Sequence, residues 1–319
     1  MGNRKPDGPE FVAPVQRLRL QYAKRGRLRF CSHRDFARAF ERSLRRAEVP
    51  MAYSAGFHPH PKISYQNAAP TGVGSEAEYL EIGLARRCEP EAVRAALDAV
   101  LPDGLDIVRA VDAADCRPGP LAEQMHASLW RLELAADPAE LAAAVDRLLA
   151  ADSVPVERLT KDGVRTLDAR APIVTATVSA GGAAGDGPAG DGPAGNSPAE
   201  DGPAGVGAVD RLVVAPVIPP VGLPIVLVTD PPTAAPAEAA TAGNDTRAIL
   251  DVVVRQVTPT VRPDDVLTAL RTVAGFAPSQ PPRATRLAQG PVDDAGRVTD
   301  PLCSTDSSGS LVRPAVPEH

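Results

Sequence analysis

The chain has 319 residues, and its 34 prolines and 26 glycines exceed the usual share, so part of the chain is predicted not to fold. Aromatic residues make up only 3%, which predicts a core of Leu, Val, Ile and Ala and argues against a large aromatic-lined cofactor pocket. The net charge is −6, but residues 1–66 carry 14 Lys or Arg against 5 Asp or Glu, which predicts an anionic partner for this basic part.

The cysteines and the apolar segments narrow the class of protein further. Cys31, Cys88, Cys116 and Cys303 are too scattered for a disulfide framework, a zinc half-site or an iron–sulfur triplet, so reduced thiols are predicted. Prolines interrupt the longest apolar region, residues 212–228, which predicts no membrane span. The first residues lack the apolar run of a signal peptide. We therefore expect a cytoplasmic protein with no metal, no cofactor and no membrane partner.

The first half of the chain shows a pattern of six elements after a disordered N-terminus at residues 1–14. Alternation over Gln16–Tyr22 predicts a half-buried strand. Ser32 as N-cap and Asp35 in the capping-box position predict a helix over 33–47. The elements expected next are strands near 62–66 and 79–84, a helix over 89–100 and a strand over 105–111. The predicted order is βαββαβ.

The second half repeats this order with one extra strand. The expected elements are a strand over 128–134, a helix over 138–150, strands near 154–159 and 173–178, a strand over 247–257, a helix over 263–273 and a short strand near 284–287. The sequence therefore predicts an α+β protein with two tandem ferredoxin-like domains. The first domain is expected over 15–115, and the second over 124–178 plus 246–290.

A low-complexity insert is predicted to interrupt the second domain at residues 179–245. Within it, Gly181–Gly205 contains repeats of five residues built from Gly, Asp, Pro and Ala. Such a segment buries too little apolar surface to offset the entropy of ordering, so disorder is expected. Residues 291–319 are polar without periodicity and are expected to be a disordered tail.

The helix predicted over 33–47 is amphipathic and carries the clearest candidate site. Phe36, Phe40 and Leu44 share one side of the helical wheel. The opposite side, here called the arginine face, consists of Arg34, Arg38, Arg42, Arg45 and Arg46. The face is either a solvated charged surface or a surface that binds RNA or another polyphosphate, because the guanidinium fork suits phosphate. The cations expected to join it are Arg17, Arg19, Lys24, Arg25, Arg27 and Arg29.

The loop Gly56–Ser64 presents His58, His60 and Lys62 from a backbone that alternating prolines hold extended. Four roles stay open for it: phosphate or base recognition, metal binding with Cys31 or His33, acid–base catalysis, and simple packing. Three carboxylates that follow are interpreted as exposed positions of a strand; they are Glu76, Glu78 and Glu81. The sequence contains no common catalytic motif.

Four segments of the first half are shared with a known family. They are RLRFCSHRD at 27–35, FERSLRRA at 40–47, GFHPHPKIS at 56–64 and GVGSEAEYL at 72–80. Together they resemble an uncharacterised bacterial family, the radical-SAM-linked domain of unknown function. Its members occur alone or attached to a cobalamin-binding radical S-adenosylmethionine protein. The chain departs from the family at Cys31 and Arg34, where an aliphatic residue is usual.

The resemblance and the charge pattern coincide on one surface. The predicted RNA or phosphate contacts are Arg27, Arg29, His33, Arg38, Arg42, Arg45, His58, His60 and Lys62. The resemblance implies a link to a radical-SAM/cobalamin-type protein, and the charge pattern predicts RNA binding. Together they favour a non-catalytic, RNA-binding accessory module for a separate radical-SAM enzyme, acting in modification of transfer or ribosomal RNA. Two alternatives stay open. One is an RNA-processing enzyme with His58 or His60 as its acid–base residue, and the other is a protein–protein adaptor with an acidic partner.

Overall fold

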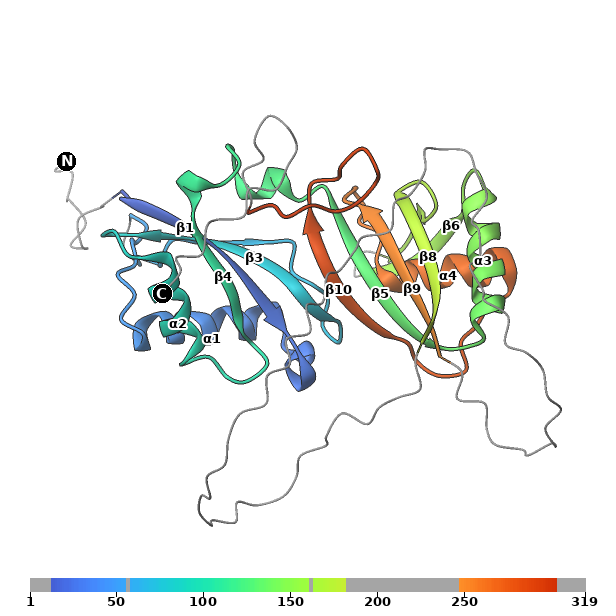
Figure 1. The fold of residues 1–319 in the computed structure, drawn as a ribbon, viewed down its shortest axis with the longest axis horizontal. Helices are drawn as coiled ribbons and strands as arrows, with labels where there is room; N and C mark the ends of the chain where they lie inside the picture. Colours follow the sequence, from blue (N-terminus) through green and yellow to red (C-terminus); the bar gives the residue numbers. More distant parts are fainter. Residues whose placement is uncertain (1–12, 56–57, 161–162, 182–246, 303–319) are drawn as a thin grey trace, which may run out of the picture. The chain divides into compact units, whose positions relative to one another are not determined.

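The computed structural model describes residues 13–55, 58–160, 163–181 and 247–302 (Figure 1). The predicted disordered N-terminus lies almost wholly outside these ranges, as do most of the predicted insert and residues 303–319 of the tail. All described residues belong to one compact unit. They form an α+β structure, as predicted. No described helix is long and apolar enough to cross a membrane.

The first half has the predicted order of elements. They are β1 (Gln16–Lys24), the 3-10 helix η1 (Gly26–Phe30), α1 (His33–Arg46), β2 (Ile63–Gln66), β3 (Gly74–Leu84), α2 (Pro90–Asp98) and β4 (Ile107–Asp112). The helix α1 begins where the sequence predicts, because the Ser32 hydroxyl accepts a hydrogen bond from the backbone N–H of Asp35 at 3.2 Å. Each of β2, β1 and β4 pairs antiparallel with its neighbour, giving the strand order β4-β1-β3-β2.

The strand β3 begins earlier than predicted, at Gly74 rather than near residue 79. The reason is that Ser75, Ala77 and Glu78 are all buried, so this segment has neighbours on both faces. A strand buried on both faces shows no alternation of polar and apolar residues, which is the pattern that sequence reasoning depends on.

The second half has the predicted elements in the predicted order and one further strand that the sequence did not predict, at Gly163–Asp168, which forms a hairpin with the strand expected near 154–159. Its elements are β5 (Ala127–Ala135), α3 (Pro138–Ala150), the hairpin strands β6 (Pro155–Thr160) and β7 (Gly163–Asp168), β8 (Ile173–Gly181), β9 (Arg247–Arg255), α4 (Pro263–Ala274) and β10 (Arg283–Gly290). Two short 3-10 helices, η2 (Ala113–Asp115) and η3 (Leu121–Gln124), connect the halves. The strand order is β10-β5-β9-β8, again antiparallel throughout.

The two halves share one sheet. Among the described residues it has eight strands in the order β4-β1-β3-β10-β5-β9-β8, with β2 also on β3. The strands β3 and β10 are parallel where Thr285 lies opposite Gly74 and Arg286 opposite Ser75. Since β2 is short and covers only the far end of this edge of β3, the beginning of the edge is left for β10. We call this junction of β3 with β10 the seam.

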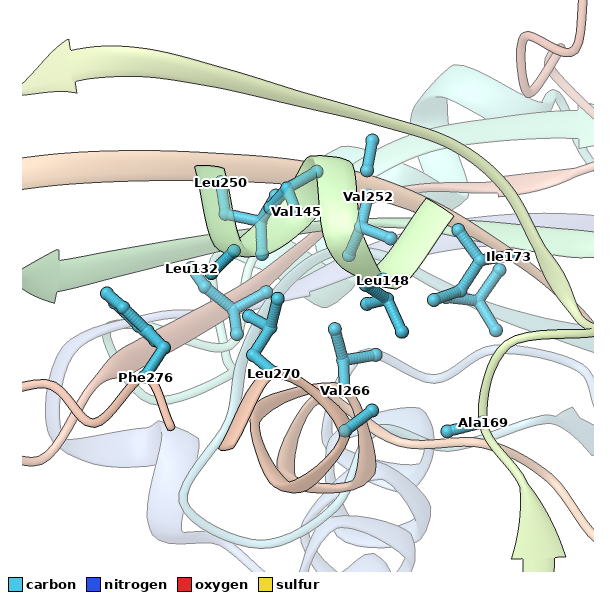
Figure 2. Close-up of a cluster of buried hydrophobic side chains, with 14 of the residues drawn as sticks. Leu132, Val145, Leu148, Ala169, Ile173, Leu250, Val252, Val266, Leu270 and Phe276 are labelled. Carbon is cyan, nitrogen blue, oxygen red and sulfur yellow. The ribbon is translucent and has the colours of Figure 1, made fainter. Parts of the chain in front are cut away.

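Each half has its own aliphatic core. In the first half, Phe36, Phe40 and Leu44 of α1 pack with Leu20 and Ile82 of the sheet. In the second half the helices α3 and α4 cover the sheet, and Figure 2 shows their side chains meeting those of β5, β8 and β9. The residues labelled there include Leu132, Val145, Leu148, Ile173, Leu250, Val252, Val266 and Leu270.

The first residues of the predicted disordered tail are ordered, contrary to expectation. Val292 pairs with Val298, and Leu302 is buried against Tyr79 and Leu121 on the face of the sheet opposite α1. The segment is polar and has no periodicity, so the sequence predicted disorder. A turn and the buried side chain of Leu302 hold it in place, and neither gives the periodic pattern of a helix or a strand.

Candidate functional site

The helix α1 is amphipathic in the structure as predicted. Phe36 is buried and stacks on Tyr22 with 4.1 Å between the ring centroids. All five members of the arginine face are exposed. Among the described residues none of the five forms an ion pair. The face therefore presents guanidinium groups whose hydrogen-bond donors are open to an external anion.

The cations of β1 do not join the arginine face, and this expectation was wrong. Arg17 and Arg19 both pair with Glu81, and Arg19 is buried. Arg25 pairs with Glu76 and with Asp106, and Lys24 is buried. The physical reason is the pairing of β1 with β3, which places the carboxylates of β3 beside the cations of β1.

Arg27 and Arg29 lie on η1, immediately before α1, together with an aromatic residue that sequence reasoning missed. Phe30 is 59% exposed, and the Arg29 guanidinium lies 4.5 Å from the centre of its ring. A cavity of about 490 Å³ lies beside them, lined also by Arg247 and Arg283 from the second half. The signal in the sequence was an aromatic residue that follows two arginines at alternate positions, a combination typical of single-stranded nucleic acid sites.

The loop that carries the histidines was predicted to be extended, and its first residues, 56 and 57, lie outside the described residues. Its described part is held by hydrogen bonds between Ser54 and His60. The His60 backbone N–H donates to the Ser54 hydroxyl at 3.0 Å, and the Ser54 N–H donates to the His60 carbonyl at 2.8 Å. His58 and His60 are both exposed. His60 and Arg45 line one cavity of about 140 Å³, so the structure brings these two predicted residues together.

Lys62 lies in a different place from His60. It lines a separate cavity of about 210 Å³ with Arg17, Ser64 and Glu81. Because Ile82 packs under α1 and strand residues alternate, Glu81 and this cavity lie on the sheet face opposite α1. The structure therefore does not place Lys62 with the arginine face.

His33 is exposed at the start of α1, and its ring meets the edge of Tyr65 with 4.9 Å between the centroids. Burial raises the pKa of Tyr65 well above its usual value, with a smaller contribution from the charge of Glu41. In the described part of the chain, no three His, Cys, Asp or Glu side chains come together as metal ligands would. The sequence alternative of a zinc site with Cys31 or His33 thus receives no support from the geometry.

Glu78 is not an exposed strand position, contrary to the interpretation from sequence. It is fully buried at the seam and forms an ion pair with Arg286, whose side chain is 3% exposed. Arg286 also donates to the carbonyl of Asn67 at 2.8 Å, and the second oxygen of Glu78 accepts from the N–H of Ala69 at 3.0 Å. This ion pair joins β3 to β10 across more than two hundred residues of sequence, so no local pattern could reveal it.

Lys24 is buried close to the same carboxylate. Its ammonium lies 3.5 Å from the carbonyl oxygen of Ala69. Burial lowers the pKa of Lys24, and the charge of Glu78 opposes that shift. Glu78 is therefore paired with Arg286, and its charge also acts on a second buried basic side chain, Lys24.

Comparison with known proteins assigns the chain to a family whose description names no activity. No curated protein matches the sequence. One family model matches residues 17–189, which is more than half of the chain and includes η1, α1 and the histidine loop. The protein therefore belongs to the family described as an uncharacterised protein conserved in bacteria, DUF2344.

Proposed function

We propose that this protein is an RNA-binding accessory module that works with a separate radical-SAM enzyme in the modification of transfer or ribosomal RNA. The observation that carries the proposal is the arginine face. Its members are exposed without ion pairs among the described residues, whereas Arg17 and Arg19 on β1 and Arg25 directly after it are paired. Between Arg34 and Arg45 the helix rises by about 16 Å, enough to follow several phosphates along a strand of RNA.

The surroundings of the helix support RNA over an acidic protein as the partner. Phe30 offers an exposed ring beside Arg29, and an unpaired base can stack on such a ring. His60 adds a donor next to Arg45 at the other end of the helix. Phosphate contacts flanked by an aromatic platform are the arrangement that proteins use for unpaired nucleotides.

The remaining parts of the proposal rest on the family resemblance and on topology. The radical-SAM partner comes from the resemblance of the segments at 27–35, 40–47, 56–64 and 72–80. We interpret each half as a ferredoxin-like domain, which the matching strand orders β4-β1-β3-β2 and β10-β5-β9-β8 support. A cytoplasmic location is part of the proposal, and the free thiols of Cys31, Cys88 and Cys116 support it.

The test is the salt dependence of RNA binding. Fluorescence anisotropy with a labelled unstructured RNA, repeated at several salt concentrations, compares the wild type with an Arg38→Gln/Arg42→Gln/Arg45→Gln variant. Each lost phosphate contact removes about 0.7 from the slope of log K against log salt, so the triple variant should lose about 2. The variant should remain folded, because these side chains are exposed.

A control variant removes the same charge from the second half. Arg147, Arg165 and Arg271 are also exposed, and changing all three to Gln should leave the slope close to that of the wild type. Equal slopes and affinities for the wild type and the arginine-face variant would contradict RNA binding by α1. Crosslinking in cells, with identification of attached RNA and attached proteins, then tests the radical-SAM partner, and capture of acidic proteins without RNA would favour the adaptor.

A further inference from the structure

A second basic hollow lies at the seam, away from the arginine face. It is a cleft of about 460 Å³, here called the seam cleft, and its volume is in the range of small-molecule sites. Both halves contribute to it: the loop after β2 with Asn67 and Thr71, and the strands β5, β9 and β10 of the second half. Its charged lining residues are Arg255, Arg262 and Arg286. In the part of the chain that the structure describes, no carboxylate lines it.

The arginines of the cleft have two different environments. Arg286 forms part of the floor, held by its ion pair with Glu78 and stacked over Trp130 at 5.3 Å from the ring centre. Arg255 and Arg262 are exposed, and neither forms an ion pair with a described residue. Their guanidinium groups are therefore available to a ligand, while the charge of Arg286 is fixed in place.

Hydrogen bonds within the protein hold one wall of the cleft. The Gln256 side chain donates to the Thr260 hydroxyl at 2.9 Å, and Arg158 donates to the carbonyl of Thr260 at 3.1 Å. The N–H of Arg262 donates to Asp265 at 2.8 Å. A wall that is already ordered loses little entropy when a ligand binds.

Electrostatics favours an anion in this cleft. Glu78 compensates the charge of the buried Arg286, whereas the guanidinium groups of Arg255 and Arg262 have no carboxylate partner among the described residues. An anion between Arg255 and Arg262 would compensate these two guanidinium charges. Two exposed guanidinium forks together with the hydroxyl of Ser128 match the several acceptor oxygens of a phosphate.

We propose that the seam cleft binds the phosphate group of a nucleotide. Two sources share this chemistry, a free mononucleotide and the 5′-terminal phosphate of an RNA. The proposal does not depend on RNA binding by α1, because none of the residues that line the cleft belongs to the arginine face.

The cleft contains its own spectroscopic probe. Trp130 lines it and is the only tryptophan in the sequence, so intrinsic tryptophan fluorescence of the full chain reports on this site alone. The titrants are pyrophosphate, adenosine 5′-monophosphate, adenosine, and one RNA oligonucleotide with either a 5′-phosphate or a 5′-hydroxyl. Isothermal titration calorimetry with the same compounds gives a second measurement of binding.

We expect the phosphate compounds to change the fluorescence and adenosine to leave it unchanged. An Arg255→Gln/Arg262→Gln variant should bind at least about tenfold more weakly, whereas Arg271→Gln on the exposed face of α4 should bind like the wild type. A preference for the mononucleotide identifies a free nucleotide as the ligand. A preference for the 5′-phosphorylated RNA over its 5′-hydroxyl form identifies an RNA end.

The proposal is overturned if no phosphate compound gives either a fluorescence change or a heat of binding. It is equally overturned if adenosine binds as well as its monophosphate, or if the Arg255→Gln/Arg262→Gln variant binds unchanged. The arginine-face variant should keep the wild-type response of Trp130 to pyrophosphate. That measurement separates the outcome at the seam cleft from the outcome for RNA binding by α1.

Discussion

Whether an arginine of this chain is paired depends on the element that carries it. Arg17, Arg19 and Arg25 lie on or beside β1 and meet the carboxylates of β3. The arginines of α1 lie on the side of the helix away from the sheet. The acidic residues nearby in the sequence are Asp35, Glu41 and Glu48, and Asp35 is hydrogen-bonded to Ser32. A count of the arginines in the sequence therefore overestimates the basic surface. The ion pairs of the folded chain determine which arginines can bind an external anion.

Replacing the Phe30 side chain should weaken RNA binding and leave the stability of the fold unchanged. The side chain is exposed, so Phe30→Ala should leave the free energy of unfolding within about 0.5 kcal/mol of wild type. Loss of a stacking platform should weaken binding of unstructured RNA by about 1–3 kcal/mol. Anisotropy with the labelled RNA measures this, and Phe30→Tyr, which keeps a ring, serves as the control. Unchanged affinity of Phe30→Ala would show that no base stacks there.

Tyr65 has a buried hydroxyl for which the described residues offer no hydrogen-bond partner. An unsatisfied buried polar group costs about 1–3 kcal/mol. Tyr65→Phe removes it and keeps the ring contacts with Phe36 and Phe40, so the variant should be more stable than wild type by about 1 kcal/mol. Urea denaturation measures the change. A loss of stability instead would mean that the hydroxyl is bonded in solution.

At the scale of elements, the stability of α1 depends on its N-cap, because the arginines on its exposed face repel one another. The Ser32 hydroxyl accepts from the N–H of Asp35 and donates to the Asp35 carboxylate at 2.7 Å. Five arginines within one helix repel one another, so packing of the apolar face and the cap must offset that repulsion.

Removal of the cap should destabilise the helix. Ser32→Ala leaves the N–H of Asp35 without its acceptor and should cost about 1 kcal/mol of unfolding free energy, measured by urea denaturation. Ser32→Asp retains an acceptor and should recover most of the loss. If Ser32→Ala were as stable as wild type, α1 would be held by packing alone.

At the scale of the whole molecule, the buried network at the seam links the two halves. Glu78 and Arg286 come from β3 and β10, and both are almost fully buried. Glu78→Gln would leave Arg286 and Lys24 in the interior without a counter-charge. Breaking one partner of a buried pair costs about 3–5 kcal/mol, and we expect a loss of that size in urea denaturation.

Two further variants show whether the loss belongs to the seam. The exposed pair of Glu91 with Arg94 provides a matched control, and Glu91→Gln should cost less than about 1 kcal/mol. A Glu78→Gln/Arg286→Gln double variant should recover part of the stability, because one of the two unpaired cations is removed. A Glu78→Gln variant as stable as wild type would mean that the two halves are held by backbone pairing alone.

Local patterns in the sequence were sufficient for most elements and for one part of the candidate site. The order of strands and helices, the amphipathic character of α1 and its N-cap all depend on neighbours within a few residues. Hydrophobic periodicity and capping are local, so they can be read without knowing the fold. The same reasoning failed for β3, because its beginning is buried on both faces and shows no alternation.

Only the tertiary structure decided which charged residues meet. The pairing of β1 with β3 removed Arg17, Arg19 and Arg25 from the basic surface. Alternation on β3 put Glu81, and with it the cavity of Lys62, on the face opposite α1. The seam, its buried Glu78, and the cleft with Arg255 and Arg262 result from contacts between β3 and β10. These contacts join residues about two hundred positions apart, and nothing in a local pattern specifies a partner at that distance, because strand pairing is chosen by the packing of the whole sheet.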